Sequence, residues 1–178
     1  NLGIGGGMQC GYQYAVRNHY DVTVQMDGDG QHDPAYLQTI VQPVLDDACD
    51  MCIGSRFITN EGFQTSFMRR VGIRFLSGMI HILCGRRVLD VTSGFRAVNA
   101  KLAQYFSLHY AIDYPEPEAI LASSLVGFRV KEAPVIMHER QGGASSIFGF
   151  KSAYYMIKVS LALIIDRFSI RKQKGGRP

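Results

Sequence analysis

Short β-rich runs alternate with stretches of helical apolar spacing along this chain, and this order constrains the fold more than any other feature. Strands are predicted over residues 22–26, 50–54 and 128–137, with a strand or turn over 91–98. Helices are predicted over residues 5–18, 35–45, 67–84, 99–107 and 117–126. Such alternation predicts a layered α/β fold with a mainly parallel sheet. Ligands of such sheets bind beyond the carboxyl ends of the strands.

The composition fits one globular domain. The chain has 178 residues, of which 47% are hydrophobic, which is too high a share for a disordered chain. Its 4 cysteines are too few and too scattered for a disulfide-stapled secreted scaffold. A reducing compartment is therefore expected.

The net charge of +4 belongs to the C-terminal tail. Residues 167–178 carry five basic and no acidic side chains, and removing these five from the total of 19 leaves 14 basic against 15 acidic residues. A nucleic-acid-binding protein more often spreads basic residues over a folded face, so we expect no nucleic acid partner. A short basic tail after an apolar stretch indicates an anionic membrane surface, and a solvated, frayed terminus is the alternative.

Two carboxylates follow the first predicted strand directly, in the order Asp27-x-Asp29-x-Gln31. Two carboxylates and an amide oxygen beside a cleft make a hard-oxygen site suited to Mg²⁺ or Mn²⁺. A calcium EF-hand loop that starts at Asp27 is excluded, because it needs Gly and Glu where this chain has His32 and Gln38. An Asp-Gly turn used only for its geometry is the alternative.

The run DGDGQHDP, residues 27–34, resembles the metal-binding signature of family 2 glycosyltransferases, which have the nucleotide-sugar fold called GT-A. The nearest subgroup looks like dolichol-phosphate mannose synthase and its bacterial polyprenyl-phosphate glycosyltransferase relatives. Further segments resemble the family in the same order, namely residues 1–6, Gly54-Ser-Arg56, Ser93-Gly-Phe-Arg96 and Arg140-x-x-Gly143-x-Ser145. The resemblance implies a GT-A-like domain over residues 1–152, followed by an apolar helix and basic tail over 153–178.

Two segments of that family are absent from this sequence. They are a first strand with Pro-x-Tyr-Asn-Glu and a later Asp-Asp-Gly-Ser turn, which bind the nucleotide base and ribose. By resemblance, the chain is expected to be N-terminally incomplete and to lack its first βαβ portion. A non-catalytic module that binds a sugar nucleotide or a partner is therefore an alternative function.

The resemblance implies an inverting, metal-dependent transferase that moves a sugar from UDP- or GDP-sugar to polyprenyl or dolichyl phosphate. Mg²⁺ or Mn²⁺ held by Asp27, Asp29 and Gln31 would offset the charge that gathers on the departing diphosphate. Asp27 and Gln31 are also expected to contact substrate. Asp29, Arg140 and Glu118 are the implied catalytic residues.

The other implied site residues contact donor or acceptor. Arg140 would close on the donor phosphates, with a surface salt bridge as its alternative role, and Ser145 lies in the same loop. Arg56 and Arg69 would grip the phosphate of a lipid acceptor. Glu118 would be the base if the acceptor were a saccharide hydroxyl, as in cell-surface polysaccharide synthesis. Its alternative role is to supply negative charge at a helix N-terminus.

Cys49 and Cys52, followed by His81 and Cys84, have the composition of a structural zinc site. Cys52 falls inside a predicted strand, however, and the second pair falls inside an apolar predicted helix. Small buried cysteines are therefore the preferred interpretation.

Residues 153–165 are apolar apart from Lys158 and Ser160, and they are too few to span a bilayer. They predict either an interfacial helix, with Tyr154 and Tyr155 at the level of lipid headgroups, or a helix packed on the core. We expect a cytoplasmic protein, peripheral at the inner face of the membrane or attached through a separate small membrane protein.

Overall fold

The computed structural model describes residues 2–139 and 150–175, and the side chains of residues 2–139 and 154–170. Within these residues, strands β1 (Val22–Gln25), β2 (Met51–Ser55), β3 (Arg96–Asn99) and β4 (Val130–Pro134) form one sheet in the order β1-β3-β2-β4. The α-helices are α1 (Gly3–Arg17), α2 (Leu37–Leu45), α3 (Phe67–Cys84), α4 (Ala100–Leu108), α5 (Pro115–Val126) and α6 (Phe150–Gly175). A short 3-10 helix, η1, spans Pro34–Tyr36 before α2.

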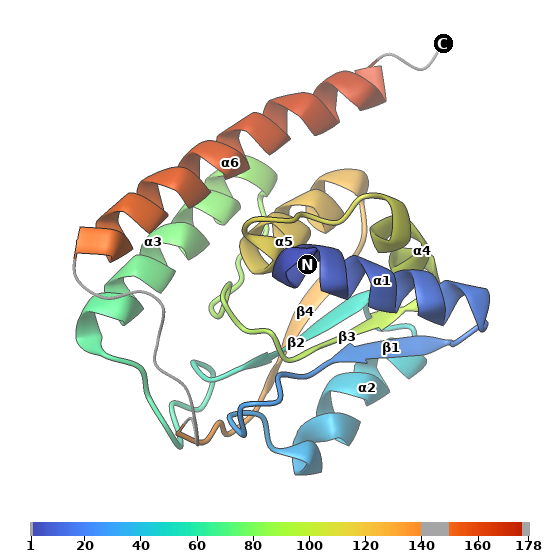
Figure 1. Cartoon of the computed structure of the whole chain (residues 1–178). Coiled ribbons are helices and arrows are strands. Elements are labelled where there is room, and N and C mark those ends of the chain that lie inside the picture. The colour runs from blue at the N-terminus through green and yellow to red at the C-terminus, as the bar shows by residue number, and fades with distance from the viewer. Residues whose placement is uncertain (1, 140–149, 176–178) are drawn as a thin grey trace.

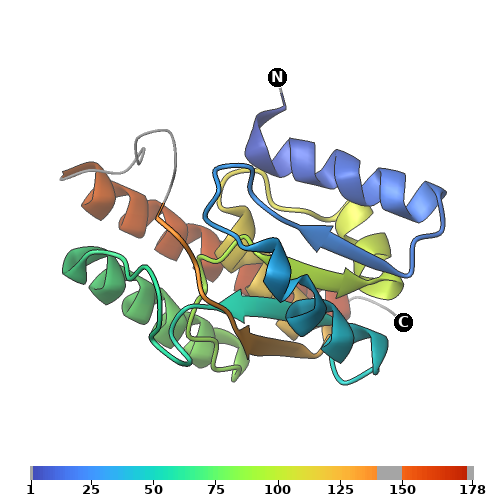
Figure 2. The ribbon, with the colours of Figure 1, turned by 90° about the horizontal axis from the view of Figure 1, so that it is seen from below.

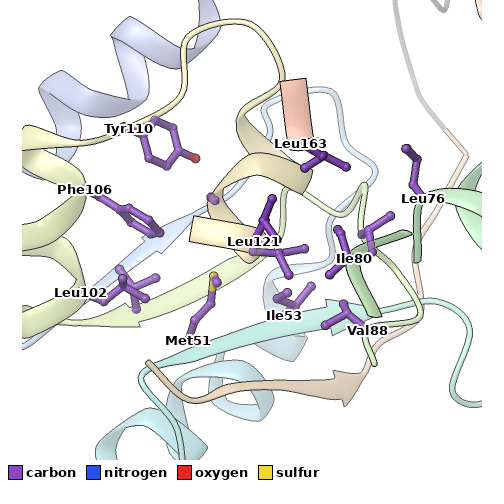
Figure 3. Packing of buried hydrophobic residues seen from close by; sticks show 14 of the residues in the cluster. Met51, Ile53, Leu76, Ile80, Val88, Leu102, Phe106, Tyr110, Leu121 and Leu163 are labelled. Carbon is purple, nitrogen blue, oxygen red and sulfur yellow. The ribbon is translucent and has the colours of Figure 1, made fainter. Parts of the chain in front are cut away.

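The two faces of the sheet are covered unequally (Figure 1). Because side chains alternate along a strand, Met51 and Ile53 of β2 point to one face and Cys52 to the other. The first face packs against side chains of α1, α3, α4, α5 and α6, which form the larger core (Figure 3). The second face packs against Ile40 and Val44 of α2. The α/β architecture is therefore confirmed.

The helix predicted over residues 67–84 is confirmed, and both of its ends have a local cause. The hydroxyl of Ser66 accepts a hydrogen bond from the Arg69 backbone N–H at 3.4 Å, which caps the N-terminus. At the other end Gly85 has a φ of 74°, a conformation that residues with a Cβ avoid. The predicted helix over 35–45 begins with η1 and contains Pro43 inside α2.

The sheet is mixed: β1, β2 and β4 run in one direction and β3 runs in the other. β3 pairs antiparallel with both β1 and β2, and the parallel pairing is the one between β2 and β4. The chain leaves the sheet at Ser55 and returns at Arg96, which lies opposite Ile53, so it re-enters at the end where it left. Helix α3 contacts α5 and α6, and Figure 2 shows it to one side of the strands instead of across them. β3 must therefore run in the opposite direction.

The apolar stretch predicted over 153–165 lies inside the longer helix α6. Val159 and Leu163 are fully buried in the larger core, so part of this helix packs on the domain as one of the two interpretations predicted. Tyr154, Ile157 and Leu161 are exposed on the same helix. None of the described helices is both long enough and apolar enough to cross a lipid bilayer.

Candidate active site

Asp27 and Asp29 lie in residues 27–31, which we call the acidic loop, just beyond the carboxyl end of β1. The side chain of Asp27 keeps 49% of its surface exposed, and Asp29 is partly buried. Both carboxylates are close enough to His32 to act on its pKa. The loop thus presents two neighbouring carboxylates near solvent, at the end of the sheet where ligands of α/β proteins bind.

His32 holds the acidic loop in place. Its Nδ1 accepts a hydrogen bond from the Asp27 backbone N–H at 3.0 Å, and its ring stacks on Phe95 with centroids 5.0 Å apart. Burial lowers the pKa of His32, although Asp27 and Asp29 act in the opposite direction. A neutral imidazole can accept this bond, so the lowered pKa and the hydrogen bond agree. The next helical segment is capped by Asp33, whose carboxylate accepts a hydrogen bond from the Ala35 N–H at 2.9 Å.

Gly94 lies directly against the carboxylate of Asp27. A Cβ at position 94 would lie 2.9 Å from Asp27 Oδ2 and 3.3 Å from Gln25 Nε2. The Ser93-Gly-Phe-Arg96 segment, far away in the sequence, therefore lies directly against the acidic loop. Only a residue without a side chain leaves room for the carboxylate in this position.

A cavity of about 440 Å³ opens beside the acidic loop. Its lining includes Asp27, His32, Asp33 and His138. The His138 backbone N–H donates to the Gln31 carbonyl at 2.9 Å, and its Nε2 lies 3.2 Å from Asp33 Oδ2. These contacts tie the acidic loop to the segment after β4. The predicted site residues Arg140 and Ser145 follow this segment and lie outside the described residues.

Arg56 follows β2 as predicted, but the structure gives it a buried partner. Its Nε and Nη2 each donate to the Asp90 carboxylate at 2.7 Å, and both side chains are almost fully buried. Glu132 in turn accepts from the backbone N–H groups of Leu89 and Asp90 at 2.8 Å. Arg56 thus joins β2 to the segment before β3, and its binding of substrate stays a prediction.

Glu118 faces α6. Burial, followed by the nearby carboxylate of Asp166, raises the pKa of Glu118 to about 7. Burial also raises the pKa of Asp166, so the two carboxyl groups form a pair that holds a proton between α5 and α6. The partner of Glu118 that the structure reveals is therefore Asp166.

Arg69 lies in the first turn of α3 with an exposed side chain. Its charge acts on Tyr155 of α6, whose pKa burial raises to about 12. The structure thus places Arg69 toward α6, and it places Asp27, Asp29 and Gln31 together in the acidic loop.

Arg96 is a further residue of this region that the sequence did not single out for a role. Its guanidinium is buried and donates to the Ser93 carbonyl at 2.7 Å and to the Glu116 carbonyl at 3.0 Å. It therefore fixes the segment that carries Gly94 to the start of α5. A buried arginine is rare without partners, but no local pattern in the sequence indicates which carbonyls it bonds.

The acidic loop offers oxygen ligands only. Mg²⁺ is commonly held by one or two carboxylates together with water and substrate phosphates, and Asp27 and Asp29 fit that role. Within residues 2–139 and 154–170, no group of three or more His, Cys, Asp or Glu side chains is placed to hold a metal ion. Cys49 and Cys52 lie in the core beneath α2, whereas Cys84 packs against the core on the opposite face.

No protein-family model matches the chain. An uncharacterized protein of Methanocaldococcus jannaschii is 30% identical over 164 residues, which cover 88% of this chain and 68% of that protein. The UDP-N-acetylglucosamine–dolichyl-phosphate N-acetylglucosaminyltransferase of Methanococcus voltae is 26% identical, over 93% of this chain and 69% of the enzyme. The polyprenol monophosphomannose synthase of Mycolicibacterium smegmatis is 28% identical, over 89% of this chain and 61% of the enzyme.

The chain belongs to a glycosyltransferase family. It spans 61% to 69% of the length of these relatives. For a glycosyltransferase, the acidic loop and the cavity beside it are the natural candidate for the active site.

Proposed function

We propose that this glycosyltransferase chain moves a sugar from a nucleotide diphosphate to a polyprenyl phosphate, with a divalent metal ion held at the acidic loop. The observation that carries the proposal is the pair of neighbouring carboxylates in the acidic loop, of which Asp27 lines a cavity at the carboxyl end of β1. Two relatives named for dolichyl phosphate and polyprenol support a lipid-phosphate acceptor.

In this proposal Asp27, Asp29 and Gln31 hold Mg²⁺ or Mn²⁺. The bound ion would supply a positive charge that offsets the charge of the departing nucleotide diphosphate. The protein's part is to keep the carboxylates in place before substrate arrives. His32 and Gly94 do so, because one fixes the Asp27 backbone and the other leaves space for its side chain.

A phosphate acceptor agrees with the surroundings of Glu118. A lipid phosphate is already anionic near neutral pH, so it needs positioning more than it needs a base. Glu118 holds a proton together with Asp166 at the contact between α5 and α6. Arg69, which carries a positive charge toward α6, is the proposed partner of the acceptor phosphate.

The membrane is the proposed location of the acceptor. Helices α3 and α6 lie side by side (Figure 1), with Met156 of α6 in contact with Gly72 of α3. Both helices expose large apolar side chains, which are Phe67, Met68, Val71, Phe75 and Ile82 on α3 and Tyr154, Ile157, Leu161, Ile164, Ile165 and Phe168 on α6. We propose that this pair of helices rests on the membrane surface, where a polyprenyl chain would be within reach.

The test is a panel of radiolabelled UDP- and GDP-sugars incubated with polyprenyl phosphate and membranes that contain the protein, followed by solvent extraction. We expect label in the organic phase, lost on chelation of divalent metal, regained with Mn²⁺ or Mg²⁺, and absent for Asp29→Asn. Label in aqueous polymer would indicate a saccharide acceptor and overturn the proposal. Nucleotide-sugar binding without any transfer would indicate a binding module and overturn it as well.

A further inference from the structure

A second cavity, of about 480 Å³, lies along α3 and shares no lining residue with the cavity at the acidic loop. Arg70, Arg74, Ser77 and His81 lie on the face of α3 that lines it. Asn60 and Arg87 line it from the segments that follow β2 and α3. We call it the basic cavity, because three of these six side chains are arginines.

No carboxylate lines the basic cavity. Across residues 2–139 and 154–170, no acidic side chain forms an ion pair with Arg70, Arg74 or Arg87. In contrast, Arg56 is paired with Asp90 and Arg129 with Asp47 and Asp50. The cavity therefore gathers positive charge that the described part of the protein does not neutralise.

Arg70 also carries an unused hydrogen-bond donor. Its Nε is buried and has no hydrogen-bond partner in the described part of the chain. A buried donor without a partner destabilises a fold, so such a donor is usually satisfied by protein, water or a ligand. The hydrogen bonds of the Arg70 guanidinium are thus not all made within the described part of the chain.

The walls of the basic cavity are fixed by hydrogen bonds. The Ser77 hydroxyl donates to the Val88 carbonyl, which joins α3 to the segment that carries Arg87. The next two residues, Leu89 and Asp90, donate their backbone N–H groups to the Glu132 carboxylate. The arginines thus line a cavity whose walls are already joined by hydrogen bonds, as a preformed anion site requires.

We propose that the basic cavity binds a phosphate group. Arginine matches phosphate with two parallel N–H donors, and Arg70 and Arg74 stand one helical turn apart on the same wall. The phosphate comes from a lipid headgroup or from a soluble phosphorylated molecule. This site is additional to the proposed transfer at the acidic loop and does not depend on it.

Binding of pyrophosphate, measured by calorimetry in buffer with a chelator, tests the phosphate site. Without a divalent ion the carboxylates of the acidic loop repel the ligand, so the result does not depend on the proposed transfer activity. The triple variant Arg70→Gln, Arg74→Gln, Arg87→Gln is compared with Arg17→Gln, Arg86→Gln, Lys101→Gln, which removes the same charge from exposed positions outside the cavity. We expect the cavity variant to bind at least about ten-fold more weakly than wild type and the control to stay within about two-fold.

Equal losses in both triple variants, or no binding by the wild-type protein, would overturn the proposal. Thermal unfolding of each variant checks that the fold is kept. Flotation with vesicles of phosphatidylcholine, with and without phosphatidic acid, distinguishes the two sources. Recruitment by phosphatidic acid that the cavity variant loses assigns a lipid headgroup, and pyrophosphate binding without such recruitment assigns a soluble ligand.

Discussion

The carboxyl ends of β1 and β2 lie at the same edge of the sheet, yet the charged side chain that follows each strand is exposed in one case and buried in the other. After β1, Asp27 keeps about half of its side-chain surface exposed beside a cavity. After β2, Arg56 is buried and bonded through two nitrogens to Asp90. Both positions follow a strand by one or two residues, so sequence position alone does not distinguish them.

The difference shows which charges serve the fold and which serve a ligand. A buried charge must be paired and hydrogen-bonded, because the loss of hydration is large. A carboxylate that remains hydrated can exchange its water for a metal ion at little expense to the fold. The β2 end is therefore expected to control stability, and the β1 end to control activity.

Asp90→Ala has the largest expected effect. It leaves the Arg56 guanidinium buried without its counter-charge, so the free energy of unfolding should fall by about 3 to 5 kcal/mol in urea denaturation. Asp27→Ala, which removes an exposed carboxylate, serves as the matched control. A loss below about 1 kcal/mol for Asp90→Ala would contradict the structural role of this pair.

Asp29→Asn and Asp27→Asn test the proposed role of the acidic loop, after β1, in activity. Each variant keeps the side-chain shape but removes a charge that the proposed metal needs. Sugar transfer should fall by at least about 100-fold, which corresponds to about 2.7 kcal/mol of transition-state stabilisation. Stability in urea should change by less than about 0.5 kcal/mol, since both residues lie near solvent. Unchanged transfer at saturating Mn²⁺ would remove these residues from the metal site.

Gly94→Ala sharpens the comparison without changing any charge. The added methyl group would approach Asp27 Oδ2 to 2.9 Å and would push the carboxylate aside. We expect about ten-fold slower transfer and a higher requirement for Mn²⁺, with a loss of about 1 kcal/mol in stability. Gly28→Ala is the control, because a Cβ there meets no heavy atom within 4 Å. Equal effects of the two variants would show that the space Gly94 leaves beside Asp27 is unimportant for activity.

Glu118→Gln is expected to leave transfer largely unchanged and to change the pH dependence of stability. Burial and Asp166 raise the pKa of Glu118 from its ordinary value of 4.5 to about 7, so the folded state holds this proton more tightly than the unfolded state. The stability that results is fully present below about pH 4.5 and is lost as the pH rises through about 7. Glutamine cannot ionise, so the variant should exceed wild type by about 1 kcal/mol near pH 8 and match it near pH 4.

Urea denaturation at both pH values measures this difference, and the exposed Glu61→Gln is the control. The same variant tests the acceptor. Transfer to a lipid phosphate should largely survive the substitution, whereas abolished transfer would indicate a hydroxyl acceptor that depends on this carboxyl group as a base.

Local features of the fold could be predicted from the sequence, and the pairing of distant segments could not. The ends of α3 follow from Ser66 and Gly85, which act on their immediate neighbours. The direction of β3 depends on the path that the chain takes after α3. The hydrophobic pattern of residues 91–98 does not indicate that path.

The same distinction applies to the candidate site. The acidic loop is one contiguous run, so its residue types were sufficient to predict it. Asp90 lies 34 positions from Arg56, and Gly94 acts on Asp27 only because the two segments meet in space. The carboxyl pair of Glu118 and Asp166 likewise arises only where α5 meets α6.

The position of β3 between β1 and β2 has a consequence for the order in which this protein assembles. Strands β1 and β2 precede β3 in the chain, have no hydrogen-bonding contact with each other, and are joined only when residues 96–99 have been made. Until β3 is made, the edges of β1 and β2 that pair with it leave backbone groups open to mispairing. Gly94 lies just before β3, so the acidic loop gains its contact with Gly94 in the same step. A chain that ended before Gly94 would contain the DGDG run but not the segment that packs against Asp27.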